Sequence, residues 1–203
     1  MKIAVVGASG NAGSRIVAEL ARRGHAVTAI ARNPAKIAKL PSVTAKPGDI
    51  HDQGSLTRLL AGHDAAISSV HFLASDPVKL IAAASDSRVG RYLVVGGAGS
   101  LEVAPGVRLV TTPGFPAQYK AEAEKGAAFL DLLRVQKELN WTFLSPSALF
   151  TAGERTGKFR LGTDQLLTGT DGKSWISFED FAVALADEIE RPAHIRKRFT
   201  VGY

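Results

Sequence analysis

The stretch IAVVGASGNAG, residues 3–13, joins an apolar run to three glycines with the spacing GxxGxxG. Ile3–Val6 is continuously apolar, as is typical of a strand that is covered on both faces of a sheet. Ser14–Arg23 follows with its apolar residues at helical spacing, and Gly24 is the kind of residue that ends a helix. The chain is therefore predicted to open with a strand, a glycine turn and an amphipathic helix.

Strand-like and helix-like segments continue to alternate beyond this unit. Further strands are predicted at Ala26–Ala31, Val43–Lys46, Ala65–Val70, Tyr92–Val95, Trp141–Leu144 and Phe199–Val201, with short ones at Lys158–Leu161 and Leu166–Thr168. Helices are predicted at 55–60, 77–84, 121–139 and after Ser177, and a loop at 98–118. This alternation indicates an α/β fold with a doubly wound, mostly parallel sheet in three layers, α/β/α. We expect one domain over residues 1–203.

Each glycine of the turn has a mechanical reason to be there. Gly7 lets the chain leave the strand tightly, Gly10 leaves room for a pyrophosphate to approach the backbone, and Gly13 lets the helix pack close to the sheet. The N–H groups and the positive end of that helix would then face the phosphates. Because the turn lies between a strand and a helix, it predicts a Rossmann fold with a dinucleotide site; a purely structural turn is the alternative. The predicted contacts are Gly7, Ala8, Ser9, Gly10, Asn11 and Ala12.

The end of the second predicted strand bears on which dinucleotide binds. Many NAD-binding proteins carry an acidic residue there, which bonds the ribose 2′-hydroxyl. This chain has Arg32, followed by Asn33 and Pro34. A guanidinium can bind a 2′-phosphate through two hydrogen bonds, and Lys36 is close enough in sequence to assist. The pattern favours NADP(H) over NAD(H), unless Arg32 is simply an exposed residue at a strand end.

Other strand ends supply further candidate contacts, because ligands of open parallel sheets bind outside the carboxyl ends of the strands. Asp49 could accept a hydrogen bond from the adenine amino group, or it could cap the turn that follows it. The remaining contacts predicted from strand ends are Ile50, Ser68, Ser69, Val70 and Gly97.

These motifs together carry a family resemblance. The glycine turn, Arg32-Asn33-Pro34, Gly48-Asp49 and the GHDA segment at 62–65 resemble the atypical short-chain dehydrogenase/reductase superfamily, and within it the NmrA-like NAD(P)H-binding branch. The segments WTFLSPSALF (141–150) and GERTG (153–157) resemble small bacterial NAD(P)-dependent oxidoreductases, which are similar in layout to flavin/biliverdin reductase B. The resemblance covers essentially the whole chain. It implies that Pro146 and Ser147 form a wall beside the nicotinamide.

The sequence departs from the superfamily where a proton is usually moved. Ordinary members carry a Tyr-x-x-x-Lys pair, in which lysine lowers the tyrosine pKa. No tyrosine here has lysine four positions later, and the adjacent Tyr119 and Lys120 do not share a helix face. Ser100 could replace the serine that the resemblance places after the fifth strand, whereas the histidine expected after the sixth is missing. His71, directly after the fourth strand, is the only histidine that we would test as a proton donor.

Hydride transfer without a strong protein acid suits acceptors that spread charge over conjugated rings. We therefore predict an NADPH-dependent reductase of a quinone, a flavin or a similar acceptor, which binds between residues 98–118 and 146–168. Its aromatic walls would come from Phe115, Tyr119, Phe150 and Phe159. The alternative is a non-catalytic, NADP(H)-sensing NmrA-like regulator that acts through a protein partner. Glu122 and Glu124 are expected to form a solvated helix start.

The amino-acid composition narrows the classes of function that remain. The 203 residues include no cysteine, which excludes a thiol nucleophile and a cysteine-based zinc site, and the five histidines lack metal-ligand spacing. The net charge of +6 admits a nucleic-acid partner, but the 25 lysines and arginines are spread along the chain, so we expect none. No apolar run approaches the roughly 18 residues of a membrane span. We expect a cytoplasmic protein, monomer or homodimer, whose partner is a small-molecule acceptor and which holds no metal.

Overall fold

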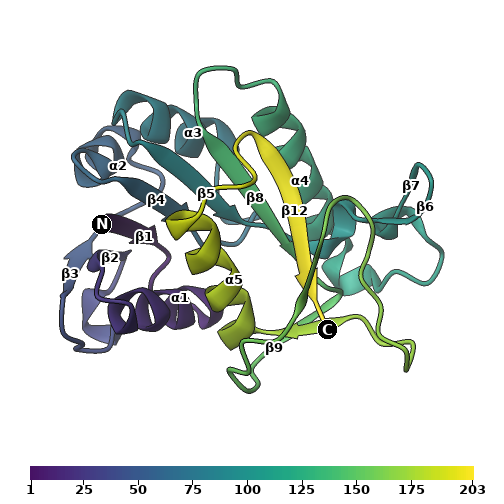
Figure 1. The fold of residues 1–203 in the computed structure, drawn as a ribbon. Helices are drawn as coiled ribbons and strands as arrows, with labels where there is room; N and C mark the ends of the chain where they lie inside the picture. The colour runs from purple at the N-terminus through teal and green to yellow at the C-terminus, as the bar shows by residue number, and fades with distance from the viewer.

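A computed structural model describes residues 1–203 and contains an eight-stranded central sheet with helices on both faces (Figure 1). The strand order is β10-β12-β8-β5-β4-β1-β2-β3, and every neighbouring pair is parallel except β10 with β12. The strands are β1 (Lys2–Val6), β2 (Ala26–Ala31), β3 (Val43–Pro47), β4 (Ala65–Ser68), β5 (Arg91–Val95), β8 (Trp141–Pro146), β10 (Arg160–Gly162) and β12 (Lys197–Gly202). The predicted doubly wound, mostly parallel α/β fold is confirmed.

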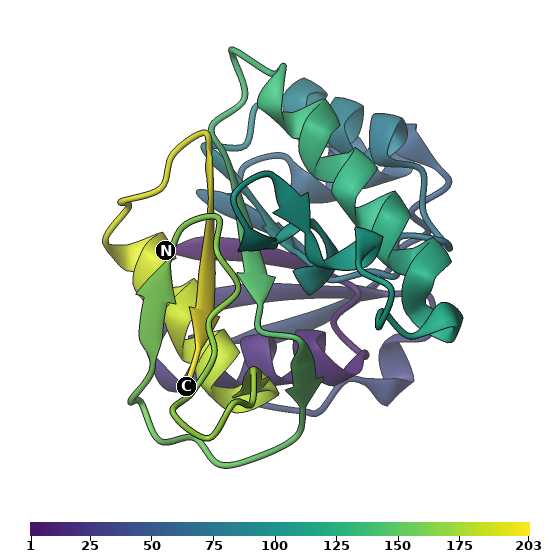
Figure 2. The same cartoon turned by 90° about the vertical axis from the view of Figure 1, so that its right-hand side faces the viewer.

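The helices form two layers with the sheet between them (Figure 2). Helices α1 (Asn11–Arg22) and α5 (Phe178–Glu190) pack together on one face. Helices α2 (Gln53–Leu60), α3 (Pro77–Asp86) and α4 (Ala117–Arg134) cover the other. Each layer buries its own apolar cluster against the sheet. None of these helices combines the length and the apolar character that a membrane crossing requires.

Strand β1 shows why the apolar run at the start of the chain is continuous. Ile3 and Val5 point into the cluster beneath α1 and α5, whereas Ala4 and Val6 point into the cluster on the opposite face. Successive side chains of a strand alternate between faces, so a strand covered on both sides needs apolar residues at every position. Its neighbours are β2 on one side and β4 on the other. The strands that follow β1 in the chain are therefore added first on one side of it and then on the other, and a crevice is expected at this point.

Helix boundaries differ from the prediction at two places. Helix α1 begins at Asn11 rather than Ser14, so that Gly13 lies inside its first turn. Helix α4 covers Ala117–Arg134 rather than 121–139. It ends early because the chain must turn before β8, and Leu139 is buried in that connection rather than on the helix.

Small strands account for the other differences. The predicted loop at 98–118 contains two 3₁₀ turns, η2 (Ala98–Ser100) and η3 (Leu109–Thr111), and the projecting hairpin of β6 (Glu102–Ala104) with β7 (Val107–Arg108) (Figure 1). The strand predicted at Leu166–Thr168 is absent; Gln165 instead makes an isolated bridge with Glu102. A parallel pair that we did not predict, β9 (Leu149–Thr151) with β11 (Trp175–Ser177), lies outside the main sheet. Strands of two or three residues carry too little periodicity to stand out in a sequence.

Candidate cofactor and acceptor site

Two adjoining cavities lie along the carboxyl ends of the strands. The first, of about 540 Å³, is bounded by the ends of β1 and β2, the segment after β3 and the connection from β4 to α3. The second, of about 410 Å³, is bounded by the start of α1, the ends of β5 and β8, and α4. Both are lined by Gly10, Ser69, Val70 and His71. They therefore form one cleft that crosses the reversal point of the sheet.

The glycine turn forms the floor of this cleft through its backbone. Gly7 has φ +80°, and a Cβ there would lie 2.0 Å from the Ser69 carbonyl oxygen. A Cβ on Gly13 would lie 2.2 Å from the Gly7 carbonyl oxygen. Gly10 caps α1 without a side-chain hydrogen bond, so the helix presents its first-turn N–H groups to the cleft. This bare cradle of backbone donors fits a pyrophosphate.

The first cavity contains the residues predicted for the adenosine half of the cofactor. Exposed Arg32 lines it, together with Asp49 and Ile50. One Asp49 carboxylate oxygen accepts a 2.9 Å hydrogen bond from the His51 backbone, so this residue caps the turn and also borders the cavity. Lys36 does not line the cavity. The arrangement leaves the Arg32 guanidinium without an ion-pair partner and free to meet an anionic ligand.

The second cavity is mainly apolar. Gly97, Pro146 and Ser147 line it as predicted, and of the four aromatic candidates Tyr119 and Phe150 do so whereas Phe115 and Phe159 do not. Phe72 and Phe178, which sequence reasoning missed, complete the aromatic wall. The Phe150 and Phe178 rings meet edge to face at 4.5 Å. Of residues 98–118 only Ala98 reaches the cavity, and residues 151–168 contribute nothing to it.

The predicted residues divide between the cleft and the interior. Ser9, Asn11 and Ala12 line the cleft, in addition to those already named. Ala8 and Ser68 are 1% exposed and line neither cavity, because their side chains point into the packed layers beside β1 and β4.

The four candidates for catalysis divide in the same way. Ser100 is buried, with its hydroxyl 3.4 Å from an Arg198 guanidinium nitrogen, and lies outside the cleft. Lys120 also lies outside it, whereas His71 and Tyr119 line the second cavity.

Glu122 is a cleft residue that sequence reasoning placed in solvent. It lines the second cavity, and its two carboxylate oxygens accept hydrogen bonds from the backbone N–H groups of Phe72 and Leu73 at 2.7 and 2.8 Å. These partners precede it by about fifty positions in the chain. No local pattern marks such a contact, because only the packing of α4 against the β4–α3 connection creates it.

A charged network joins α1 to the segment around Arg155. Glu19 on α1 is 4% exposed and pairs with Arg22, Arg23 and Arg155. Burial by itself raises the Glu19 pKa, but the hydrogen bonds from the three arginines outweigh it and hold the pKa well below its usual range.

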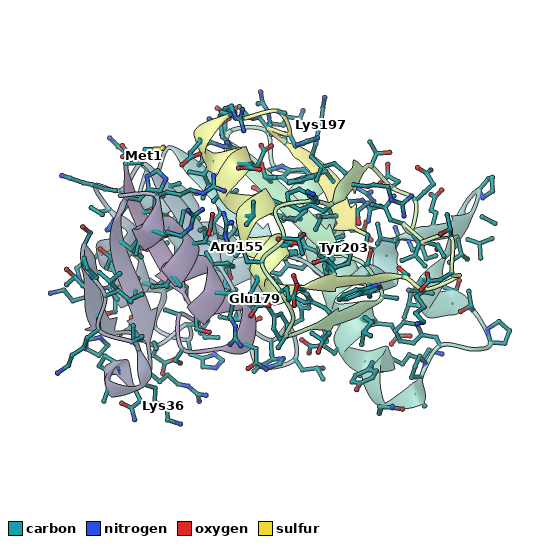
Figure 3. The ribbon with its side chains drawn as sticks, turned by 60° about the horizontal axis from the view of Figure 1, so that its bottom comes forward. Met1, Lys36, Arg155, Glu179, Lys197 and Tyr203 are labelled. Carbon is teal, nitrogen blue, oxygen red and sulfur yellow. The ribbon has the colours of Figure 1, made fainter.

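Glu179, on α5, makes a second set of contacts between the same segments. It accepts hydrogen bonds from Arg15 of α1 and from the Gly153 backbone N–H. Figure 3 shows Arg155 and Glu179 over the seam between α1 and α5. The network thus ties residues 153–155 to the two helices beside the second cavity. No cluster of metal-ligating side chains is present.

The fold and the bare glycine cradle define a dinucleotide-binding Rossmann protein, and comparison with known sequences specifies the family. Residues 7–192 match the model of the NAD(P)H-binding family. The chain is also 40% identical, over 209 aligned positions, to the uncharacterized protein YwnB of Bacillus subtilis; the alignment covers 99% of this chain and 98% of YwnB. The chain therefore belongs to the NAD(P)H-binding family. This membership confirms the resemblance drawn from the sequence.

Solved structures agree with this family. A Burkholderia pseudomallei structure, described as a "putative exported protein", is 45% identical with a TM-score of 0.90, and the match covers both chains completely. A Streptococcus pneumoniae structure, described as a "putative NADH-flavin reductase", is 38% identical with a TM-score of 0.84, and the match covers 100% of this chain and 99% of that one. The whole architecture is thus shared with these relatives.

Proposed function

We propose that this protein is an NADPH-dependent reductase of a conjugated acceptor such as a quinone or a flavin. The observation that carries the proposal is the continuity of the two cavities through Gly10, Ser69, Val70 and His71. A dinucleotide that starts in the first cavity and crosses the glycine turn would place its nicotinamide at the mouth of the second. An acceptor in the second cavity would then lie against the nicotinamide.

The preference for NADPH is supported by Arg32. Its guanidinium borders the first cavity at the end of β2, and no carboxylate pairs with it. A 2′-phosphate there would gain a charge-assisted, bidentate hydrogen bond, whereas a 2′-hydroxyl would not.

The choice of acceptor is supported by the aromatic wall. Phe72, Phe150 and Phe178 surround a space large enough for a planar ring system, and such rings pack favourably against one another. When bound, NADPH supplies a hydride, which carries two electrons. The chain orients the acceptor against the nicotinamide. The Streptococcus relative described as an NADH-flavin reductase is consistent with this class of acceptor.

Calorimetry with NADPH and NADH tests the cofactor assignment. Arg32→Ala should weaken NADPH binding by about 10- to 100-fold, because hydrogen bonds to charged groups contribute about 1.5–3 kcal/mol each, and it should leave NADH binding nearly unchanged. Arg58→Ala, an exposed arginine of α2 outside both cavities, is the matched control. Equal losses for both cofactors would contradict the role of Arg32.

Adding a quinone or a flavin to the same samples tests turnover. Oxidation of NADPH on addition of acceptor supports the reductase. Tight binding without turnover would instead support the alternative, a non-catalytic NADP(H) sensor. If neither cofactor bound, the site itself would be wrongly assigned.

The proposal includes a cytoplasmic location, with which the absence of cysteine is compatible. Because the Burkholderia relative is described as exported, cell fractionation should accompany the kinetic work. Recovery of the protein outside the cytoplasm would contradict this part of the proposal.

A further inference from the structure

His71 is the titratable side chain at the junction of the two cavities. It lines both, directly after β4, and its side chain is 89% exposed to the cleft and the solvent. Its Nδ1 atom lies 3.5 Å from the Glu122 Oε1 atom. That contact places Nδ1 beside α4, and Nε2 makes no hydrogen bond within the protein.

Glu122 fixes the segment that carries His71. Its carboxylate accepts hydrogen bonds from two consecutive backbone N–H groups, those of Phe72 and Leu73. The Phe72 ring is 8% exposed and packs edge to face on Phe129 at 5.9 Å. One carboxylate and one buried ring therefore hold the backbone that immediately follows His71. These contacts fix the backbone beside His71 at the junction of the two cavities.

The other polar side chains of the second cavity are poorly suited to supply a proton. Glu122 uses both carboxylate oxygens to accept the Phe72 and Leu73 backbone N–H groups. The Ser147 hydroxyl is fully buried and donates to the Val201 carbonyl oxygen. Tyr119 is 61% exposed, and no lysine lines the cavity beside it. Imidazole is the group that changes charge near neutral pH.

We propose that His71 donates the proton that completes reduction of the acceptor, and that Glu122 is a positioning residue that orients the imidazole. This inference rests on the reductase function proposed above. Hydride addition to a quinone leaves a negative charge on a quinone oxygen. The Nε2–H bond of the imidazolium breaks, the oxygen takes the proton, and the exposed ring regains a proton from water. In sum, NADPH, one proton and a quinone give NADP⁺ and a hydroquinone.

The test compares His71→Gln, Glu122→Gln and the control Glu124→Gln, which changes an exposed carboxylate of α4 without a hydrogen-bond partner. The probe is a water-soluble naphthoquinone. His71→Gln should lower kcat by about tenfold or more while calorimetric NADPH affinity stays within twofold of wild type. General acids contribute about 10²–10⁴-fold, and a charge-delocalised acceptor lies at or below the low end of that range.

The pH profile separates a proton donor from a structural residue. Wild-type kcat should fall as the pH rises through the range in which imidazole loses its proton, and His71→Gln should lose this dependence. The other titratable or charged groups that line the two cavities are Arg32, Asp49, His51, Asp76, Tyr119 and Glu122. A profile that is unchanged in His71→Gln would assign the dependence to one of these groups and overturn the proposal.

Backbone amide hydrogen exchange tests Glu122 without reference to activity. Glu122→Gln has one carbonyl oxygen in place of two carboxylate oxygens, so the Phe72 and Leu73 amides should exchange faster, whereas Glu124→Gln should leave them unchanged. Unaltered exchange in Glu122→Gln would refute the positioning role.

The kinetic outcomes separate this inference from the proposed function. If His71→Gln reduced quinone as fast as the wild-type protein does, the inference would be refuted and the reductase function would stand. A wild-type protein that binds NADPH and reduces no acceptor would refute both.

Discussion

Replacing Gly13 by alanine should separate the packing role of the glycine turn from its chemical role. The new Cβ would lie 2.2 Å from the Gly7 carbonyl oxygen, 3.0 Å from the Gly7 carbonyl carbon and 3.2 Å from Ala8 Cα. All three atoms belong to the backbone, so no side-chain rotation relieves the contact. Helix α1 must move away from the turn by about 1.2 Å before the closest contact reaches an ordinary 3.4 Å.

The expected loss of stability follows from two opposing terms. Overpacking costs about 1–3 kcal/mol, and an unrelieved backbone contact belongs at the upper end of that range. Alanine inside a helix stabilises the fold by up to about 1 kcal/mol relative to glycine. The free energy of unfolding should fall by about 2 kcal/mol. For a chain of this size that corresponds to a Tm lowered by about 4–8 °C.

The same displacement of α1 should weaken binding of the cofactor. Moving the first turn of α1 by about 1 Å lengthens the N–H···O contacts to the pyrophosphate beyond hydrogen-bond range, and losing one such bond lowers NADPH affinity by about tenfold. Urea unfolding and calorimetry measure the two effects.

Gly54→Ala is the matched control for Gly13→Ala. Gly54 also lies in a helix, but a Cβ there would meet only side-chain atoms of Arg58 and Asp52, at 3.7 and 3.8 Å. This variant should be as stable as wild type or more stable by up to about 1 kcal/mol, with unchanged NADPH binding. If Gly13→Ala behaved like Gly54→Ala, the close approach of α1 to the turn would not matter and the reasoning would fail.

Three further variants test the charge networks and the aromatic wall. The folded-state pKa of Glu19 lies below its unfolded value, so its contribution to stability is present above about pH 4.5 and is lost as the pH falls. Glu19→Gln should therefore flatten the acid side of a stability-against-pH curve from urea unfolding, and an unchanged curve would contradict the network. Glu188→Gln breaks the buried ion pair with Arg91, whose atoms lie 2.8 Å apart, and should lower the free energy of unfolding in urea by about 3 kcal/mol. A loss below about 1 kcal/mol would contradict a stabilising role for this pair. Phe178→Ala should raise the acceptor KM by about tenfold while NADPH affinity is unchanged, and the reverse pattern would move the acceptor elsewhere.

Local sequence signals were sufficient wherever one strand, turn or helix could be recognised by itself. The apolar run at Ile3–Val6, the GxxGxxG turn and the alternation of strands and helices predicted the sheet and the position of the cleft. Arg32, Asp49 and Ser69 were found because strand ends are recognisable and all parallel strands present their carboxyl ends to one edge.

Residues that depend on contacts between distant segments were not predictable in this way. The β9–β11 pair brings together residues 149–151 and 175–177, and Glu122 bonds a backbone segment about fifty positions earlier. Ser100 and Phe72 illustrate the same limit, since packing buried the first behind Arg198 and turned the second toward the cleft. The sequence by itself determined the fold and the cofactor half of the cleft, because short-range periodicity and strand ends encode them. Only the tertiary structure placed Phe72, Glu122 and Phe178 in the second cavity, because they come from helices and connections that meet through long-range packing.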